Sequence, residues 1–364
     1  MSGKHVALLH PALRFTGETE RVLAIARVLS RRGWRTTLVT RPGSRTHAFD
    51  SMAREYGFGL RFCEIPLRPS TAPFAFMRTR RLIAELECDL IHVVSDSLAP
   101  LAGALASTVG TPYVLEVHSE PAGRIARFQP RLMAVAVSSQ TLAASVVNQG
   151  RIPRGLLHVA RHAPEVDPAS IPTHHELDDR RPLRIGCSGA LDELHAAETF
   201  VEAVRLLGQL PRPCHFAILG EGPHESALRR HVRELGLADR ITIGVPTTPD
   251  AAQTLAALDV HVSTRQSGGP GWLCHLALAL GVPSILSAVG EAFNLVEDKR
   301  SALLFERGNP RQLADAIENM CANPEETHAL GERARRRMRE LRPPGMFAKD
   351  IEALHAAAFE LAGA

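Results

Sequence analysis

Short apolar runs alternate with longer amphipathic stretches along this chain, and this alternation limits its fold more than any other feature. The run VALLH at 6–10 is almost wholly apolar, as a buried strand is. The stretch 18–33 that follows has helical spacing and stops at Gly33. Strands that alternate with helices in this way form βαβ units and parallel sheets. We therefore predict an α/β fold built from doubly wound sheets.

The first half of the chain holds enough of these segments for one open, doubly wound sheet. The tail, with helical stretches around a Pro-Pro pair, is expected to return to this half. The expected strands are 6–10, 35–40, 89–94, 113–118 and 132–138, and the expected helices are 18–33, one around 78–86, one around 99–109, one from Ser139, and 324–341 and 346–361 in the tail.

A second alternating series follows a break in composition. Residues near 164–182 carry prolines and charges without an apolar period, which is typical of an interdomain linker. At 364 residues, the chain is long for one core, so two domains are expected. The expected strands of this series are 183–189, 215–220, 240–244, 259–263, 283–287 and 302–305, and the helices are 198–210, 225–236, 250–257, 272–280 and 310–322.

The predicted organisation is therefore an N-terminal Rossmann-like domain over 1–165 and a linker over 166–182. A C-terminal Rossmann-like domain over 183–340 follows, and 341–364 form a helix that crosses back to the first domain. Open α/β sheets bind ligands at the carboxyl ends of their strands, so loops of both domains are expected to line one cleft.

Composition excludes several classes of protein. The net charge is +3, and no basic stripe with interleaved aromatic residues is present, so a nucleic-acid partner is not supported. Of 42 basic residues, 39 are arginine, which we attribute first to genomic base composition. Six scattered cysteines fit a reducing cytoplasm and no zinc site or disulfide framework. No apolar run approaches the ~20 residues of a membrane span, and the N-terminus is expected to be a buried strand.

The segment 259–283, DVHVSTRQSGGPGWLCHLALALGVP, predicts an anion site. An apolar strand leads into a turn with Gly268, Gly269 and Gly271, and a helix of small and apolar residues ends at Gly281. Backbone N–H groups at the start of such a helix attract phosphate or sugar oxygens.

This segment resembles the motif of the retaining glycosyltransferases of family 4, P-S-x-x-E-G-x-G-x-x-x-x-E-A-x-A-x-G-x-P. Its glycines, alanines and final proline match without a gap. Both glutamates of the motif are absent: the first falls at Gly268 and the second at Leu276. The resemblance implies that the first binds the donor sugar and the second the nucleotide ribose.

The resemblance covers nearly the whole chain. TGETERVLAIARVLSRRG is similar to the family's G-G-x-E-R helix, CDLIHVV to its P-D-x-x-H strand, EVHS to its x-x-H loop and AILGEGP to its x-x-G-x-G-P turn. It implies the GT-B architecture, in which two Rossmann-like domains face each other across a cleft.

Other donor-side positions also depart from the family pattern. GCSGALDELHA resembles G-R-L-x-x-x-K-G, so Gly189 matches, but the phosphate-binding arginine falls at Ala190 and the lysine near His195. We expect Arg265, just before the glycine turn, or His195 to replace part of the lost charge. Further on, Asn294 stands at a family glutamate, and Lys299 and Ala302 stand at two family glycines.

The turn Gly220-Glu221-Gly222-Pro223 lies between an expected strand and helix. The family keeps such a turn near the nucleotide base, so Gly220, Glu221, Gly222 and Gly244 are assigned to that region. As a dinucleotide fingerprint the turn is incomplete, because a third glycine and a later acidic residue are missing.

In the first domain, His118 matches the histidine that lies beside the transferred sugar in the family, and it is the candidate catalytic residue. A strand-end histidine bonded to the backbone is the alternative. Gly17 and Glu18 open the first long helix and are candidates for the acceptor loop, with Glu18 also suited to a first-turn charge. His158 and His162 have metal-ligand spacing but no third ligand, so no metal site is assigned.

The resemblance favours a glycosyltransferase of hexosyltransferase type, retaining and metal-independent, with a nucleotide sugar as co-substrate and no cofactor. Its acceptor is expected to be a glycan, a lipid-linked molecule or a small molecule, as in bacterial polysaccharide or glycoconjugate synthesis, and peripheral contact with a membrane stays open. The alternative is a catalytically inactive protein of the same fold that binds a glycan or assists an active glycosyltransferase. An altered donor, such as a sugar phosphate, is a third reading.

Overall fold

The computed structural model describes residues 3–41, 46–121, 125, 131–166, 181–192, 194–246, 251–267 and 269–363, and every statement on the structure refers to these residues. They form two compact units. The first contains Met1–Arg14, Glu18–His162 and Gly345–Ala364, and the second contains Phe15–Gly17 and Ala163–Pro344. Most of the stretch expected to be a linker lies outside the described residues.

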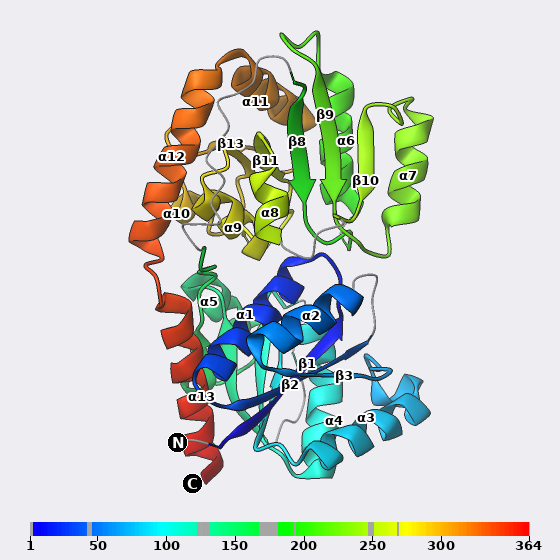
Figure 1. Cartoon of the computed structure of the whole chain (residues 1–364), viewed down its shortest axis with the longest axis vertical. Coiled ribbons are helices and arrows are strands. Elements are labelled where there is room, and N and C mark those ends of the chain that lie inside the picture. Colours follow the sequence, from blue (N-terminus) through cyan, green and yellow to red (C-terminus); the bar gives the residue numbers. More distant parts are fainter. Residues whose placement is uncertain are drawn as a thin grey trace. The chain divides into compact units, whose positions relative to one another are not determined.

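The described part of the first unit contains one sheet of seven strands, in the order β3-β2-β1-β4-β5-β6-β7, with all neighbours parallel (Figure 1). The order departs from the chain sequence between β1 and β4, as it does in a doubly wound sheet. The strands are β1 (His5–Ala12), β2 (Arg35–Arg41), β3 (Gly59–Phe62), β4 (Leu90–Val93), β5 (Tyr113–Val117), β6 (Leu132–Val137) and β7 (Leu157–Val159).

The apolar run in β1 is continuous because this strand is central. It pairs with β2 on one side, where Leu8 lies opposite Leu38, and with β4 on the other, where Leu8 lies opposite His92. Val6 and Leu8 are fully buried. Both sides of a central parallel strand face helices, so apolar residues occupy both.

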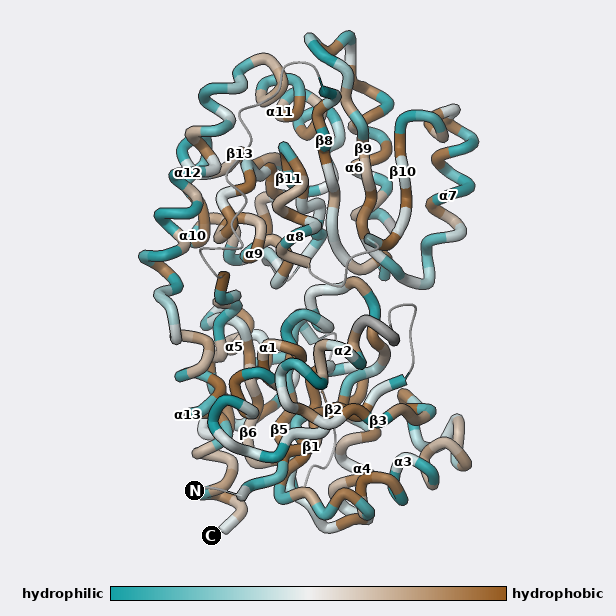
Figure 2. The backbone as a smooth tube through the Cα atoms, in the orientation of Figure 1, coloured by the Kyte–Doolittle hydropathy of each residue, from teal (hydrophilic) through white to brown (hydrophobic). Residues whose placement is uncertain are grey.

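Helices cover this sheet through one apolar face each. In α1, Val22, Ile25 and Leu29 are buried at helical spacing, and brown hydrophobic positions recur along the helices in Figure 2. Ser139 caps α5, because its hydroxyl accepts the N–H of Leu142. The helices are α1 (Gly17–Arg31), α2 (Thr46–Tyr56), α3 (Pro73–Leu86), α4 (Ala99–Val109), α5 (Gln140–Asn148) and α13 (Met346–Gly363).

The described part of the second unit contains a parallel sheet of six strands, in the order β10-β9-β8-β11-β12-β13. The strands are β8 (Leu183–Ser188), β9 (Cys214–Leu219), β10 (Ile241–Gly244), β11 (Val260–Ser263), β12 (Ser284–Ser287) and β13 (Leu303–Phe305), and the helices are α6 (Leu194–Leu206), α7 (Glu225–Glu234), α8 (Ala251–Ala256), α9 (Trp272–Leu280), α10 (Ala292–Leu295), α11 (Pro310–Ala322) and α12 (Pro324–Leu341).

The two parallel sheets confirm the predicted α/β fold, and a few elements differ from expectation. Helix α2 and strand β3 were not expected, helix α3 starts at Pro73, and α6 covers 194–206 instead of 198–210. Proline suits the first turn of a helix, where its missing N–H is not needed. Among the described residues, none of the helices combines the length and the apolar character that crossing a membrane requires.

Candidate functional site

Each sheet has one point where the strand order reverses, and these points locate the candidate sites. In the first unit the point lies between β1 and β4, and in the second it lies between β8 and β11. Open α/β sheets bind ligands beyond the carboxyl ends of the strands at such a point. The residues that follow these four strands are therefore the first to consider.

Arg265 lies at the carboxyl end of β11 in the second unit. It is half-buried, and its Nε is enclosed without a hydrogen-bond partner. Within the described part of the chain, the guanidinium has no carboxylate partner either. Its backbone carbonyl accepts the hydroxyl of Ser287 at 2.6 Å, which fixes the loop. A half-buried arginine without an anion is poised to bind one, because its planar fork matches phosphate oxygens.

The glycine turn brings the start of α9 next to this arginine. Gly269 has φ +87, which side chains rarely adopt, and Gly271 is the N-cap of α9. A Cβ placed on Gly271 would lie 3.5 Å from Nη1 of Arg265, so the guanidinium sits against the turn. Gly268 lies outside the described residues. Arg265 and the N-terminus of α9 together form a positively charged corner at the end of the sheet.

The turn at Gly220 and Gly222 has a structural reason for its glycines. A Cβ on Gly220 would lie 1.9 Å from the carbonyl oxygen of Gly189, and one on Gly222 would lie 2.3 Å from that of Leu191. The loop after β8 and the turn after β9 are thus packed backbone to backbone. Glu221 joins them, because its carbonyl accepts the N–H of Leu191 at 3.0 Å.

The end of β10 completes the same edge of the sheet. The carbonyl of Gly244 accepts the N–H of Gly220 at 3.2 Å, and the N–H of Gly189 is bound to Leu219 at 3.1 Å. Backbone bonds therefore hold Gly189, Gly220 and Gly244 at the ends of three adjacent strands. Their assignment to phosphate or to a nucleotide base remains a prediction.

Among the described residues, His195 interacts with a residue of its own helix and not with Arg265 or the start of α9. Its side chain is 90% exposed, and its Nδ1 lies 3.0 Å from Glu198 one turn along α6. Leu276, at the position of the second family glutamate, is buried and packs against Ala251, Leu255 and Val282. Apolar residues thus surround the position at which the family motif has its second glutamate.

Lys299 and Asn294 are two further positions that differ from the family pattern. Lys299 has φ +60, a left-handed conformation, at a position where the family has glycine. Its N–H bonds to the carbonyl of Ala302 at 2.8 Å. Asn294 is exposed, and its carbonyl accepts from Arg337. The turn has therefore kept a conformation that suits glycine although the residue has changed.

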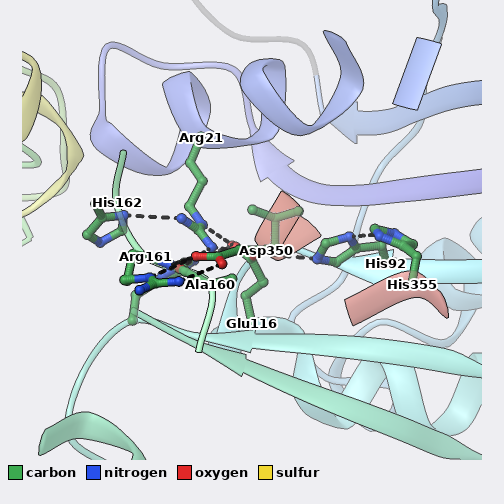
Figure 3. Close-up of polar contacts among 10 residues, drawn as sticks. Arg21, His92, Glu116, Ala160, Arg161, His162, Asp350 and His355 are labelled. Atoms are coloured by element: carbon green, nitrogen blue, oxygen red, sulfur yellow. Dashed lines mark hydrogen bonds and ion pairs between the residues drawn. The ribbon is translucent and has the colours of Figure 1, made fainter. Parts of the chain in front are cut away.

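In the first unit, a buried ion pair lies beneath the carboxyl ends of the strands. Arg21 of α1 binds both oxygens of Glu116 in β5: Nε to Oε2 at 2.7 Å and Nη2 to Oε1 at 2.9 Å (Figure 3). The carbonyl of Ala160 accepts a further bond from Arg21 at 3.0 Å, and Nδ1 of His162 lies 3.2 Å from its Nη1. His162 is therefore a hydrogen-bonded histidine.

The carboxylate of Glu116 is ionised. Burial alone would raise its pKa, but the charge of Arg21 and the contacts with His118 and His92 hold the pKa well below its ordinary value. A buried charge of this kind needs several partners, and here the surrounding side chains supply them.

Glu116 fixes the orientation of His118, the candidate catalytic histidine. Nε2 of His118 lies 3.0 Å from the carbonyl of Val94 and 3.2 Å from Oε2 of Glu116. Both oxygens can only accept, so Nε2 carries a proton and Nδ1 has the lone pair of the neutral ring. The bond to a backbone carbonyl matches the alternative that the sequence left open, and the carboxylate adds a second constraint.

Neighbouring charges also shift the pKa of His118. Burial would lower its pKa, yet the hydrogen bond and charge of Glu116 and the charge of Glu18 raise the pKa above its ordinary value. Glu18 stands in the first turn of α1, which Gly17 opens. The structure thus brings Glu18 and His118 into electrostatic contact, and a histidine with such a pKa is suited to hold or transfer a proton.

A chain of two buried histidines reaches Glu116 from α13 (Figure 3). Nδ1 of His355 donates to the carbonyl of Ile351 at 2.8 Å, Nε2 of His355 lies 3.2 Å from Nδ1 of His92, and Nε2 of His92 lies 3.4 Å from Glu116. Three such contacts need three protons, whereas two neutral imidazoles supply two. The longest contact, between Nε2 of His92 and Glu116, is accordingly not a hydrogen bond.

Helix α13 closes this network. Asp350 binds Arg161 through both oxygens, at 3.0 and 2.7 Å, and the ring of Phe347 lies 5.1 Å from the guanidinium carbon of Arg21. The last helix of the chain is thus tied to the network by one ion pair, one cation–π contact and one histidine.

The sequence analysis did not single out Arg21, Glu116, His92 and His355 as site residues, although Arg21 and His92 end two of the matched family motifs. The signal that could have found two of them is a polar residue within an otherwise apolar strand, as in YVLEV and LIHV. Such a residue is buried on both sides and needs a partner. Nothing in the sequence names that partner, because Arg21 and Glu116 are 95 positions apart.

Two family models match separate parts of the chain. The model described as glycosyl transferase 4-like domain matches residues 16–160, and the model described as glycosyl transferases group 1 matches residues 182–323.

Curated relatives are similar over much of the chain. A 2-deoxystreptamine N-acetyl-D-glucosaminyltransferase of Streptomyces fradiae is 30% identical over 259 residues, or 63% of this chain, and the match spans only 61% of that relative's length. A GDP-mannose-dependent alpha-(1-6)-phosphatidylinositol monomannoside mannosyltransferase of Mycobacterium tuberculosis is 26% identical over 342 residues, covering 84% of this chain and 86% of that protein.

Solved structures share the fold. HepE of Anabaena, crystallised with UDP-glucose, has a TM-score of 0.75 at 16% identity and covers 97% of this chain and 99% of its own. Sucrose-phosphate synthase of Thermosynechococcus elongatus has a TM-score of 0.73 at 19% identity, with 98% and 99% covered. The parallel sheets, the two family matches and these relatives agree: the chain belongs to the family 4-like glycosyltransferases of GT-B fold.

Proposed function

We propose that this chain transfers a sugar from a nucleotide-sugar donor, and that the donor's diphosphate binds at Arg265 and the start of α9. The observation that carries the proposal is the half-buried guanidinium of Arg265, which has an enclosed Nε without a partner. It stands at the reversal point of the second sheet, beside a glycine turn and a helix N-terminus. A diphosphate would satisfy all three features.

Arg265 compensates for the basic residues that the family pattern expects elsewhere. Ala190 has no charge, and His195 is exposed and bound to Glu198. One charge-assisted hydrogen bond contributes about 1.5–3 kcal/mol, so a single well-placed arginine restores roughly tenfold to a hundredfold in affinity. The donor is therefore expected to bind through its phosphates more than through its ribose, since Leu276 offers the ribose no acceptor.

For the chemistry, we propose a retaining transfer that needs no divalent cation. Arg265 is a permanent positive charge at the position of the leaving diphosphate, and preorganised charge of this kind stabilises a developing anion. The acceptor is proposed to bind the first unit near His118, whose Nδ1 is free of the constraints on Nε2. Chelation of metals would then leave the rate unchanged, and a strict requirement for a metal ion would contradict this part.

The names of the relatives guide the choice of substrates to test. One relative is named for transfer of N-acetyl-D-glucosamine to 2-deoxystreptamine, and another is named as dependent on GDP-mannose. We propose a hexose or amino-hexose donor linked to UDP or GDP, and a hydroxyl acceptor on a small polyol or a glycolipid headgroup.

A second candidate function rests on a specific observation. Leu276 is buried in an apolar cluster, so no side-chain movement short of unpacking α9 exposes an acceptor there. This favours a protein of the same fold that no longer binds a nucleotide-sugar donor and that binds a glycan or assists an active glycosyltransferase.

Titration calorimetry with UDP, GDP and their sugars separates the two candidates. Micromolar binding of a nucleotide diphosphate, followed by sugar release or transfer, is the expected result. No heat from any nucleotide at millimolar concentration would reject the transferase and leave the binding protein.

A further inference from the structure

We infer that the exposed side of α3 docks on a membrane surface rich in anionic lipid headgroups. The described residues contain six exposed large hydrophobic side chains, and four of them lie in α3 and in the short segment from β3 to α3. The four are Phe62, Leu67, Phe74 and Met77, which are 38%, 48%, 80% and 59% exposed.

Helix α3 places apolar and basic side chains on one exposed face. Phe74, Met77, Arg78 and Arg81 are all exposed, and their spacing of three, four and seven residues puts them on the same side of the helix. Figure 2 shows the change from hydrophobic residues at the start of α3 to hydrophilic ones in its middle. The exposed side of α3 is therefore apolar near the start of the helix and basic further along it.

The opposite face of α3 anchors it to the unit. Ala75, Thr79, Ile83 and Leu86 are buried, and Thr79 donates to the carbonyl of Glu64 at 3.0 Å. The helix packs beside α4 (Figure 1). Because these contacts already fix the helix, Phe74 and Met77 are not exposed through loose packing, and none of the described elements covers them.

Charge selects the partner. Residues 61–81 contain five arginines and one glutamate, a net charge of +4, whereas the whole chain has +3. Arg81 pairs with Glu85 at 2.8 Å on the surface, but among the described residues Arg78 and Arg80 have no carboxylate partner. The other exposed acids of this helix and its end, Glu85 and Glu87, follow the basic part. Basic residues around aromatic and aliphatic side chains fit a negatively charged lipid interface.

Exposed apolar and basic residues also precede α3. β3 is the terminal strand of the sheet, and its Arg61 and Phe62 are both exposed, on opposite faces because they are neighbours on a strand. In the loop that follows, exposed Leu67 stands beside exposed Arg68, as Met77 stands beside Arg78 on α3. Apolar side chains next to basic ones suit insertion between anionic headgroups.

Flotation of the full-length chain with lipid vesicles tests the assignment. The wild-type chain is expected to float with vesicles of phosphatidylcholine and phosphatidylglycerol, to stay behind with pure phosphatidylcholine, and to be released by high salt. The double variant Phe74→Ser/Met77→Ser and the double variant Arg78→Gln/Arg81→Gln should each lower the fraction bound by about tenfold or more.

Matched controls come from the second unit. Phe293 is 62% exposed without an adjacent basic pair on its helix, and Arg230 and Arg233 are exposed on α7 without exposed large apolar neighbours. Phe293→Ser and Arg230→Gln/Arg233→Gln should float like wild type. All the changed side chains are exposed, so unchanged unfolding curves confirm that each variant is folded.

Three results would overturn the inference. The wild-type chain does not float with anionic vesicles, or the α3 variants float as well as wild type, or the control variants lose as much binding. A concentration-dependent dimer that the α3 variants abolish, without vesicle binding, would assign the face to self-association instead. The experiment needs no donor or acceptor, so its outcome does not depend on the proposed glycosyl transfer.

Discussion

Arg21 and Glu116 form a two-point ion pair in the interior of the first unit, with both side chains almost fully removed from solvent. Around it lie His118, which faces the end of the sheet, and the histidines of β4 and α13. The charges of this pair influence the pKa values of the groups around it, so removing either partner should have measurable consequences.

Breaking the pair from one side should be costly. Arg21→Leu leaves an ionised carboxylate buried without its main partner, and we expect a loss of about 3–5 kcal/mol in the free energy of unfolding. The double variant Arg21→Leu/Glu116→Leu should lose much less than the sum of the single variants, because it leaves no unpaired charge. Urea unfolding followed by circular dichroism measures all three. Additive losses would show that the two side chains are not coupled.

The pKa of His118 should respond to the charge of Glu18. Since that charge contributes to the raised pKa, after the larger influence of Glu116, Glu18→Gln should lower it. NMR titration of the imidazole signals gives the pKa directly, and the variant leaves the Arg21–Glu116 pair intact. Glu20→Gln on the same helix serves as control and should leave the His118 titration unchanged. An identical titration in Glu18→Gln would contradict the proximity of the two groups.

Acid should destabilise the chain before its carboxylates titrate. Burial, with the charge of a neighbouring histidine as a second cause, lowers the pKa of His10 and of His355 to about 3, and burial lowers that of His261 to about 4. The unfolded chain takes up these protons near pH 6.5 and the folded chain does not. Each histidine therefore costs about 1.4 kcal/mol per pH unit as the pH falls from about 6.5 towards the folded pKa.

Two other groups act around the same network. His118 has a raised pKa, so its contribution is present below about pH 6.5 and is lost as the pH rises through the folded pKa. Glu116 has a lowered pKa, so its contribution is present above about pH 4.5 and is lost at lower pH. Below about pH 6.5 the contribution of His118 no longer changes, so the slope between about pH 6.5 and 4.5 comes from the buried histidines with lowered pKa values and should be a loss of stability in acid.

A substitution of His10 tests the contribution of one buried histidine to the loss of stability in acid. Neither of its ring nitrogens makes a hydrogen bond within the described residues, so His10→Phe removes a titrating group and no partner. The slope of unfolding free energy against pH should become shallower by about 1.4 kcal/mol per unit. His195→Gln changes an exposed side chain and serves as control. An unchanged slope in His10→Phe would mean that His10 is protonated in the folded chain.

Lys299→Gly should stabilise the second unit. Lys299 has φ +60, which costs a residue with a side chain about 1–2 kcal/mol, although glycine is more flexible when unfolded. The expected gain is up to about 1 kcal/mol, visible as a higher midpoint of thermal unfolding. Lys349→Gly, within α13, is the opposite control and should destabilise by about 1 kcal/mol. A lower midpoint for Lys299→Gly would mean that the lysine side chain stabilises the turn.

The sequence was sufficient to predict the fold, because short apolar runs, amphipathic stretches with helical spacing, and glycine and proline breaks are local signals. The β11 to α9 segment was predicted almost to the residue, as was the end of α9 at Gly281. Helix α2 was missed although Phe49, Met52 and Ala53 have helical spacing and are buried. In that case the signal was present in the chain.

The site was only partly predictable. Motif matching pointed to His118, and the need to replace lost charge pointed to Arg265 just before the glycine turn. The structure places each after the carboxyl end of a central strand. The partnership of Arg21, Glu116, His92 and His355 depends on which strands become neighbours and on where the last helix packs. Those are long-range contacts, and no local pattern encodes them.

The affinity of the chain for UDP or GDP, compared between wild type and Arg265→Ala by titration calorimetry, tests whether Arg265 binds the donor's diphosphate. We expect that wild type binds one of these diphosphates and that Arg265→Ala weakens binding by at least about tenfold. Arg265→Lys should fall between them because it keeps the charge and loses the fork, and Arg230→Ala should bind like wild type. Equal affinity in wild type and Arg265→Ala would contradict the account.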